Sequence, residues 1–189
     1  MFKRGFKSWC ESVAAKYRKD LDLAFDGSLP PKLLAQKLNV LVWKPEDIPG
    51  LDKKDLTQLT KNDPKSWSAV TLQLPQIEAI IVNSAHALVR QTSSIMHELS
   101  HIILEHKPAR VDVSDQGYLL LHNYDRTQED EADWLAATLL VPREALLVVF
   151  ARVKTPQEAA KHFGVSTDLL EWRKRMTGVQ AQLARRSKI

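Results

Sequence analysis

The chain has 189 residues, a formal net charge of +4 and a hydrophobic fraction of 44%. This length suits one globular domain, or one domain with a small helical appendage, and the apolar fraction is ordinary for a buried core. The single cysteine, Cys10, excludes an internal disulfide and fits a reducing compartment, so we expect a cytoplasmic protein.

The apolar runs of the chain are short, and its charges are unevenly spread. The basic N-terminus breaks into polar residues before reaching signal-peptide length, and the best later run, residues 145–149, is far below the about twenty residues of a membrane span. We therefore expect no membrane association. Residues 1–20 carry six basic and two acidic side chains, and residues 171–189 carry six and one. Such basic ends favour a polyanion, or they are solvated helical faces.

The N-terminal part of the sequence predicts helices and a small sheet. Helical periodicity runs through residues 8–23, and Pro30 and Pro31 open a second helix. The other expected elements are a strand at 40–43, a brief helix at 53–60, and two strands at 67–74 and 77–82 that form a hairpin around Pro75 and Gln76. We expect an α+β fold with a mostly antiparallel three-stranded sheet beside helices that follow in the chain.

Residues 97–101 read HELSH and match the zinc-hydrolase pattern H-E-x-x-H. On a helix, residues four apart share a face, so His97 and His101 can bind one ion while Glu98 reaches a water at the metal. The neighbouring apolar residues predict that helix, with Thr92 to Ser94 as N-cap candidates. The alternative is a buried histidine pair satisfied by carboxylates or backbone without a metal.

A hydrolytic zinc site needs a third protein ligand and one open position. A second helix is predicted around residues 129–140, with Thr127 as a plausible cap. Glu129 and Asp133 lie on one stripe of it, whereas Glu131 points roughly the opposite way. Glu129 is therefore the better third ligand, and Asp133 can accept the second N–H of a ligating histidine. The alternative, an acidic first turn that suits the helix dipole, fits Glu131 better than Asp133.

Between the two metal helices, residues 108–126 read as polar and irregular. Tyr118, His122 and Tyr124 in this stretch could stabilise an oxyanion, but each also reads as an ordinary loop residue. His106, at the end of the first metal helix, suits the dipole there.

The C-terminal part of the sequence predicts three short helices. An apolar helix covers residues 144–153; then Thr155 caps a helix that Pro156 starts, Gly164 turns the chain, and Ser166 caps the next helix. This spacing fits a helix-turn-helix that binds DNA, or two helices that pack on the rest of the protein; we favour packing.

The run RQTSSIMHELSHIILEH at residues 90–106, followed by EDEADWLAATLLVP at 129–142, resembles the ImmA/IrrE family of bacterial metallopeptidases. That family is similar to the gluzincins and typically shows HELGH and then ExEANxFAxxLLMP. The sequence departs from this pattern at three positions: Ser100 replaces Gly, Asp133 replaces Asn, and Val141 replaces Met.

The resemblance implies zinc ligands at His97, His101 and Glu129, with Glu98 as catalytic base. It also implies a zincin-like domain at residues 1–153, followed by a C-terminal helix-turn-helix-like segment at 154–189. The chain has no room for the additional sensor domain of IrrE-like members, so it resembles the shorter ImmA-like type.

Together these patterns predict a zinc-dependent endopeptidase. The family resemblance implies a helix-turn-helix repressor as substrate, whose cleavage derepresses phage, mobile-element or stress-response genes. The alternative is a non-proteolytic regulatory protein that binds a repressor or DNA, with zinc serving structure only.

Overall fold

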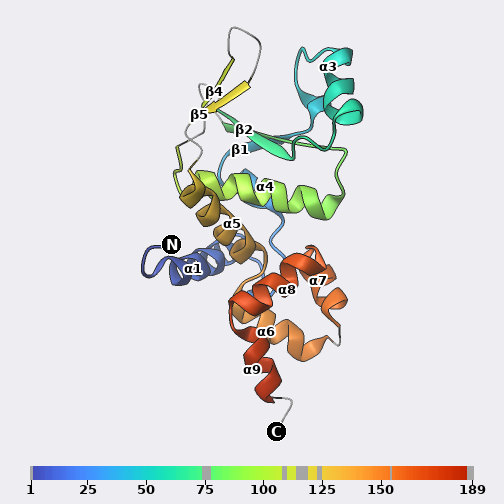
Figure 1. The fold of residues 1–189 in the computed structure, drawn as a ribbon. Helices are drawn as coiled ribbons and strands as arrows, with labels where there is room; N and C mark the ends of the chain where they lie inside the picture. Colours follow the sequence, from blue (N-terminus) through green and yellow to red (C-terminus); the bar gives the residue numbers. More distant parts are fainter. Residues whose placement is uncertain are drawn as a thin grey trace.

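The computed structural model describes residues 2–73, 78–107, 110–113, 119–122, 125–153 and 155–186. Helices and strands alternate irregularly along the chain, which confirms the α+β class. In chain order the elements are α1 (Phe6–Asp20), α2 (Pro31–Lys37), β1 (Val40–Trp43), η1 (Pro45–Asp47), α3 (Lys53–Thr57), η2 (Gln58–Asn62), β2 (Ala69–Gln73), β3 (Glu78–Val82), α4 (Leu88–Ile103), β4 (Arg110–Val113), β5 (Leu119–His122), α5 (Arg126–Leu140), α6 (Arg143–Arg152), α7 (Pro156–Phe163), α8 (Thr167–Met176) and α9 (Val179–Arg186), as Figure 1 shows.

The three expected strands form one sheet with the order β1-β3-β2. β2 pairs with β3 antiparallel, as the hairpin prediction requires, and β1 pairs with β3 in parallel, so the sheet is mixed. The predicted turn at Pro75 and Gln76 lies outside the described residues. Residues 79–82 of the central strand β3, which has a paired strand along each edge, are all buried. Because β3 lies between β1 and β2, β2 is at an edge of this sheet.

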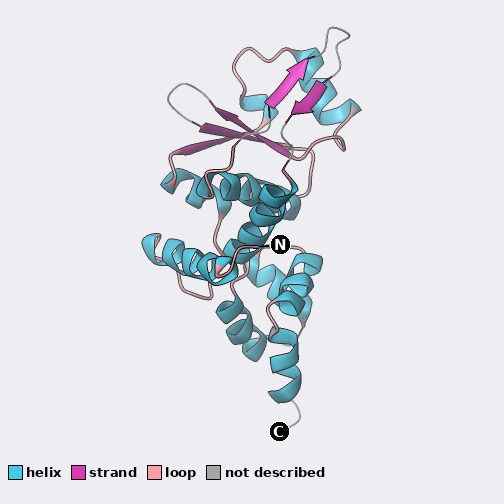
Figure 2. Cartoon of the chain, turned by 60° about the vertical axis from the view of Figure 1, so that its left-hand side comes forward, coloured by secondary structure: helices cyan, strands magenta, loops and turns pink. Residues whose placement is uncertain are grey.

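Helix α4 lies against one face of the sheet and packs on α5 (Figure 2). Its buried side chains include Ile95, Met96 and Leu99, spaced as one helical face. The predicted start of this helix was wrong: α4 begins at Leu88, and the hydroxyls of the predicted cap residues Ser93 and Ser94 donate instead to backbone oxygens one turn earlier.

Helix α5 lies in the middle of the molecule and runs from the sheet side towards the C-terminal helices, among which α6 lies (Figure 1). The stretch Arg126–Arg152 is long and apolar enough to cross a membrane, which the sequence estimate of residues 145–149 missed. However, Val141 and Pro142 break it into two helices, and 67% of its most apolar window is buried inside the fold. The stretch is therefore explained as the core of this protein.

The prediction that the region between α4 and α5 is irregular was wrong in part. β4 and β5 form an antiparallel pair in which Arg110 is opposite His122 and Val113 is opposite Leu119. These two strands are hard to predict from the sequence, because each has four residues and the apolar run of β5 is short.

The start and end of α7 and the start of α8 lie where the turn residues predict, whereas the sequence prediction did not include α9. The hydroxyl of Thr155 accepts from the backbone N–H of Glu158, Gly164 ends α7 at φ 69°, and Ser166 caps α8. α8 packs on α5 and α6, with the Trp172 ring 5.4 Å from that of Trp134 on α5. The division of the chain into two domains at residue 153 stays a prediction.

Candidate metal centre

Helices α4 and α5 bring His97, His101 and Glu129 together. The histidines lie one turn apart on α4, and Glu129 is in the first turn of α5, which crosses α4 at this point. One ligand atom from each of the three side chains lies within 4.8 Å of the other two. The two Nε2 atoms are 3.0 Å apart, and the Glu129 oxygens lie 3.4 Å from His97 Nε2 and 3.5 Å from His101 Nε2.

These separations fit a single divalent ion. Nitrogen and oxygen ligands of tetrahedral zinc at about 2.0–2.1 Å from the ion lie roughly 3.3 Å from one another. The three side chains retain 25%, 22% and 36% exposure for His97, His101 and Glu129. The site is therefore partly open to solvent, which is compatible with an open fourth position.

Asp133, one turn after Glu129 on α5, holds the other ring nitrogen of His97. Its Oδ1 lies 2.9 Å from His97 Nδ1, which leaves Nε2 to face His101 and Glu129. Burial disfavours the charged form of His97, but the hydrogen bond and negative charge of Asp133, with smaller effects of Glu98 and Glu129, outweigh it and raise the pKa of His97. The Asp133 contact therefore fixes the ring and makes it more basic.

His101 has a comparable partner that the sequence analysis read differently. His106 Nδ1 lies 2.9 Å from His101 Nδ1, and His106 Nε2 lies 3.4 Å from Glu131 Oε2. From the sequence, His106 was predicted to compensate the helix dipole and Glu131 to point away from the site. This arrangement was not predicted because it depends on the turn of the chain after α4. Burial, together with His97 and His106, lowers the pKa of His101 to about 4. His101 is therefore neutral at pH 7, as a metal ligand must be.

Glu98 is adjacent to His97 and is held by a residue of the sheet. The hydroxyl of Thr71, in the middle of β2, donates to Glu98 Oε2 at 2.6 Å. No sequence signal identified Thr71, since it is separated from Glu98 by 27 positions. Tyr118 and Tyr124 lie outside the described residues, and the side chain of His122 is not described.

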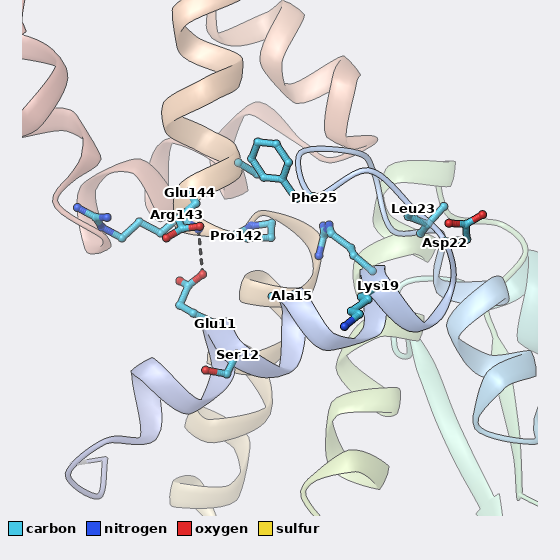
Figure 3. Close-up of a pocket in the computed structure, with 12 residues that line it drawn as sticks. Glu11, Ser12, Ala15, Lys19, Asp22, Leu23, Phe25, Pro142, Arg143 and Glu144 are labelled. Carbon is cyan, nitrogen blue, oxygen red and sulfur yellow. Dashed lines mark hydrogen bonds between the residues drawn. The ribbon is translucent and has the colours of Figure 1, made fainter.

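A cavity of about 520 Å³ lies at the opposite end of α5, between α1 and the start of α6 (Figure 3). Glu129 and Pro142 are separated by 13 residues, or about 20 Å of helix. In this cavity the carboxylate of Glu11 accepts from the backbone N–H of Arg143 and so caps α6. The residues that line this cavity include neither histidine nor cysteine, so we assign the metal centre to His97, His101 and Glu129.

The fold and this group define a class: an α+β protein with a zincin-like arrangement, in which an HExxH helix and a glutamate from the next helix converge beside a small sheet. The model of the IrrE N-terminal-like domain, a peptidase family, matches residues 54–174. The chain belongs to that family. No curated protein matches the sequence.

Proposed function

We propose that the protein is a zinc-dependent endopeptidase that cleaves a helix-turn-helix transcriptional repressor. His97, His101 and Glu129 would hold the zinc ion, and Glu98 would act as general base. The observation that carries this proposal is the convergence of three ligand atoms within 4.8 Å in a chain of a peptidase family. Repressor cleavage would derepress phage, mobile-element or stress-response genes.

The roles of the side chains follow from their contacts. Bound zinc would supply Lewis acidity, which lowers the pKa of a water molecule towards about 7 and polarises a peptide carbonyl. Glu98 takes the proton of the attacking water on a carboxylate oxygen and delivers it to the leaving nitrogen. Thr71 donates to Glu98 Oε2 and so restricts the rotation of this carboxylate. His97 and His101 are held in place by hydrogen bonds to Asp133 and His106.

The position of strand β2 supports the proposal that the substrate binds in an extended conformation. Among the described residues, β2 pairs only with β3 in this sheet, so its other edge can accept a strand. Thr71, at the middle of β2, contacts Glu98. A peptide paired along β2 would therefore pass close to the base, with the bond to be cut near Glu98.

The chemistry is tested with Glu98→Gln. We expect the variant to bind zinc as tightly as the unmodified protein, because Glu98 is not a ligand, and to cleave the repressor about 10²–10⁴ times more slowly. The substrate is the repressor encoded nearest to the gene of this protein. Electrophoresis and mass spectrometry measure the loss of the intact repressor. Chelation should abolish cleavage, and added zinc should restore it.

Glu144→Gln is the matched control, because Glu144 is an exposed glutamate at the start of α6, at the opposite end of α5. It should cleave at the unmodified rate. Equal cleavage by Glu98→Gln would refute the proposed base. Repressor that binds to the protein but stays intact would instead support the non-proteolytic alternative.

A further inference from the structure

The end of helix α4 folds His106 back onto the metal-binding turn. The backbone N–H of Glu105 donates to Ile102 O at 3.1 Å, and that of His106 donates to His101 O at 3.0 Å. Glu105 has φ 53°, in the left-handed region. This is the hydrogen-bond pattern of a Schellman C-cap. It ties His106 to His101 through the main chain.

The two rings also meet. His106 Nδ1 lies 2.9 Å from His101 Nδ1, and the ring centroids are 5.0 Å apart at 68°. The other nitrogen of His106 faces Glu131 Oε2 at 3.4 Å. A backbone bond and a ring contact between the same two residues define the position of His106 closely.

These contacts allow one set of tautomers for a metal ligand. If His101 presents its Nε2 lone pair to a metal, its proton is on Nδ1, which must donate. His106 Nδ1 must then accept, so the His106 proton is on Nε2 and is donated to Glu131. Each histidine ligand is thus held by a carboxylate of α5: His97 directly by Asp133, and His101 through His106 by Glu131.

The contacts that run from His101 through His106 to Glu131 are better shielded from water than the contact between His97 and Asp133. The side chains of His106 and Glu131 are 8% and 17% exposed, whereas that of Asp133 is 71% exposed. Hydrogen bonds with little access to water are less weakened by solvent competition. The contacts that hold His101 are therefore less open to competition from water than the contact that holds His97.

We propose that His106 is a positioning residue that holds His101 in the tautomer and orientation needed to bind the metal, and that Glu131 holds His106. This inference rests on the proposed metal site. His106 and Glu131 thereby have a function beyond ending helix α4. Without them, the His101 ring would have to become ordered when the metal binds.

The test measures zinc affinity by competition with a chromophoric chelator. His106→Phe keeps a ring but removes the acceptor, and we expect zinc affinity to fall about 10–100-fold. His106→Asn restores an oxygen near the position of Nδ1 and should recover most of the affinity. In the zinc-loaded protein, ¹⁵N shifts of the histidine rings should report a proton on Nδ1 of His101.

His162→Asn is the matched control. His162 Nε2 contacts the backbone oxygen of Asp26, away from the metal centre, and its replacement should leave zinc affinity unchanged. Urea unfolding of every metal-free variant separates positioning from stability. Equal affinity loss in His106→Phe and His106→Asn, in step with lost stability, would overturn the proposal.

Unchanged affinity in His106→Phe, or a proton on Nε2 of His101, would also overturn it. If His106→Phe does not fold, Glu131→Ala decides: lower zinc affinity supports the proposal, and unchanged affinity refutes it. His101→Ala distinguishes this inference from the proposed function. If its affinity equals that of the unmodified protein, the metal site itself is wrong; if only His101→Ala loses zinc, the site stands and the role of His106 fails.

Discussion

At the scale of single residues, the metal centre depends on which ring nitrogen of each histidine is free. Asp133 engages Nδ1 of His97 and leaves Nε2 for the metal. Because its carboxylate is largely exposed, water can replace part of its hydrogen bond. Its contribution to metal binding should therefore be real but smaller than that of a fully buried partner.

We expect Asp133→Ala to weaken zinc binding about tenfold, at the low end of the range for residues that orient metal ligands. Asp133→Asn should bind nearly as well as the unmodified protein, since its amide oxygen still accepts from Nδ1. Chelator competition measures both. Asp168→Ala, in the first turn of α8, is a control for the loss of one acidic charge. Equal affinities of Asp133→Ala and Asp133→Asn would contradict this assignment.

At the scale of elements, the position of α5 depends on how its last carbonyl groups are satisfied. Arg18 of α1 donates to the backbone oxygens of Leu139 and Leu140, and Arg173 of α8 donates to that of Val141. Both arginine side chains are fully buried, and burial lowers the pKa of each guanidinium. Two helices distant in sequence thus complete the end of α5, whose other end carries Glu129.

Arg18→Ala should destabilise the protein, because it leaves buried carbonyl oxygens without donors and creates a cavity. We expect the free energy of unfolding to fall by about 2–4 kcal/mol. Urea unfolding of the metal-free protein measures this. Lys16→Ala, on the exposed side of the same helix, should leave the unfolding midpoint unchanged. Equal midpoints for the two variants would show that Arg18 does not support α5.

At the scale of the whole molecule, the C-terminal helices belong to the same packed core as the metal helices. Trp172 of α8 packs edge-to-face on Trp134 of α5, which directly follows Asp133. Arg173 donates to Glu11 of α1 at 2.7 Å. These contacts favour the packing interpretation of α7 and α8, and they connect the tail to the helix that carries Glu129.

Trp172→Ala should lower the free energy of unfolding by about 2–3 kcal/mol, somewhat less than a fully buried tryptophan, because its side chain is only partly buried. Met176→Ala, at an exposed position of the same helix, should have little effect. Thermal and urea unfolding of both variants provide the comparison. Stability unaffected by Trp172→Ala would indicate that the tail is only loosely attached.

Much of the local structure follows from local sequence signals. The i, i+4 histidines, the apolar run of β1, and the caps Thr155 and Ser166 act over a few residues, and the corresponding elements are present. The helix starts at Thr92 to Ser94 and at Thr127 were wrong. α4 begins without a side-chain cap, so no capping residue marks its start, and at α5 the carboxylate of Asp125 accepts from the backbone N–H of Thr127.

Helical periodicity places residues at fixed angles, so the sequence is enough to put His97, Glu98 and His101 on one helix and Glu129 and Asp133 on the next. The contact of Thr71 with Glu98, and the link from His101 through His106 to Glu131, are seen only in the folded chain. Those contacts depend on how a strand, a helix end and a second helix pack in space. No periodicity within one element encodes that packing.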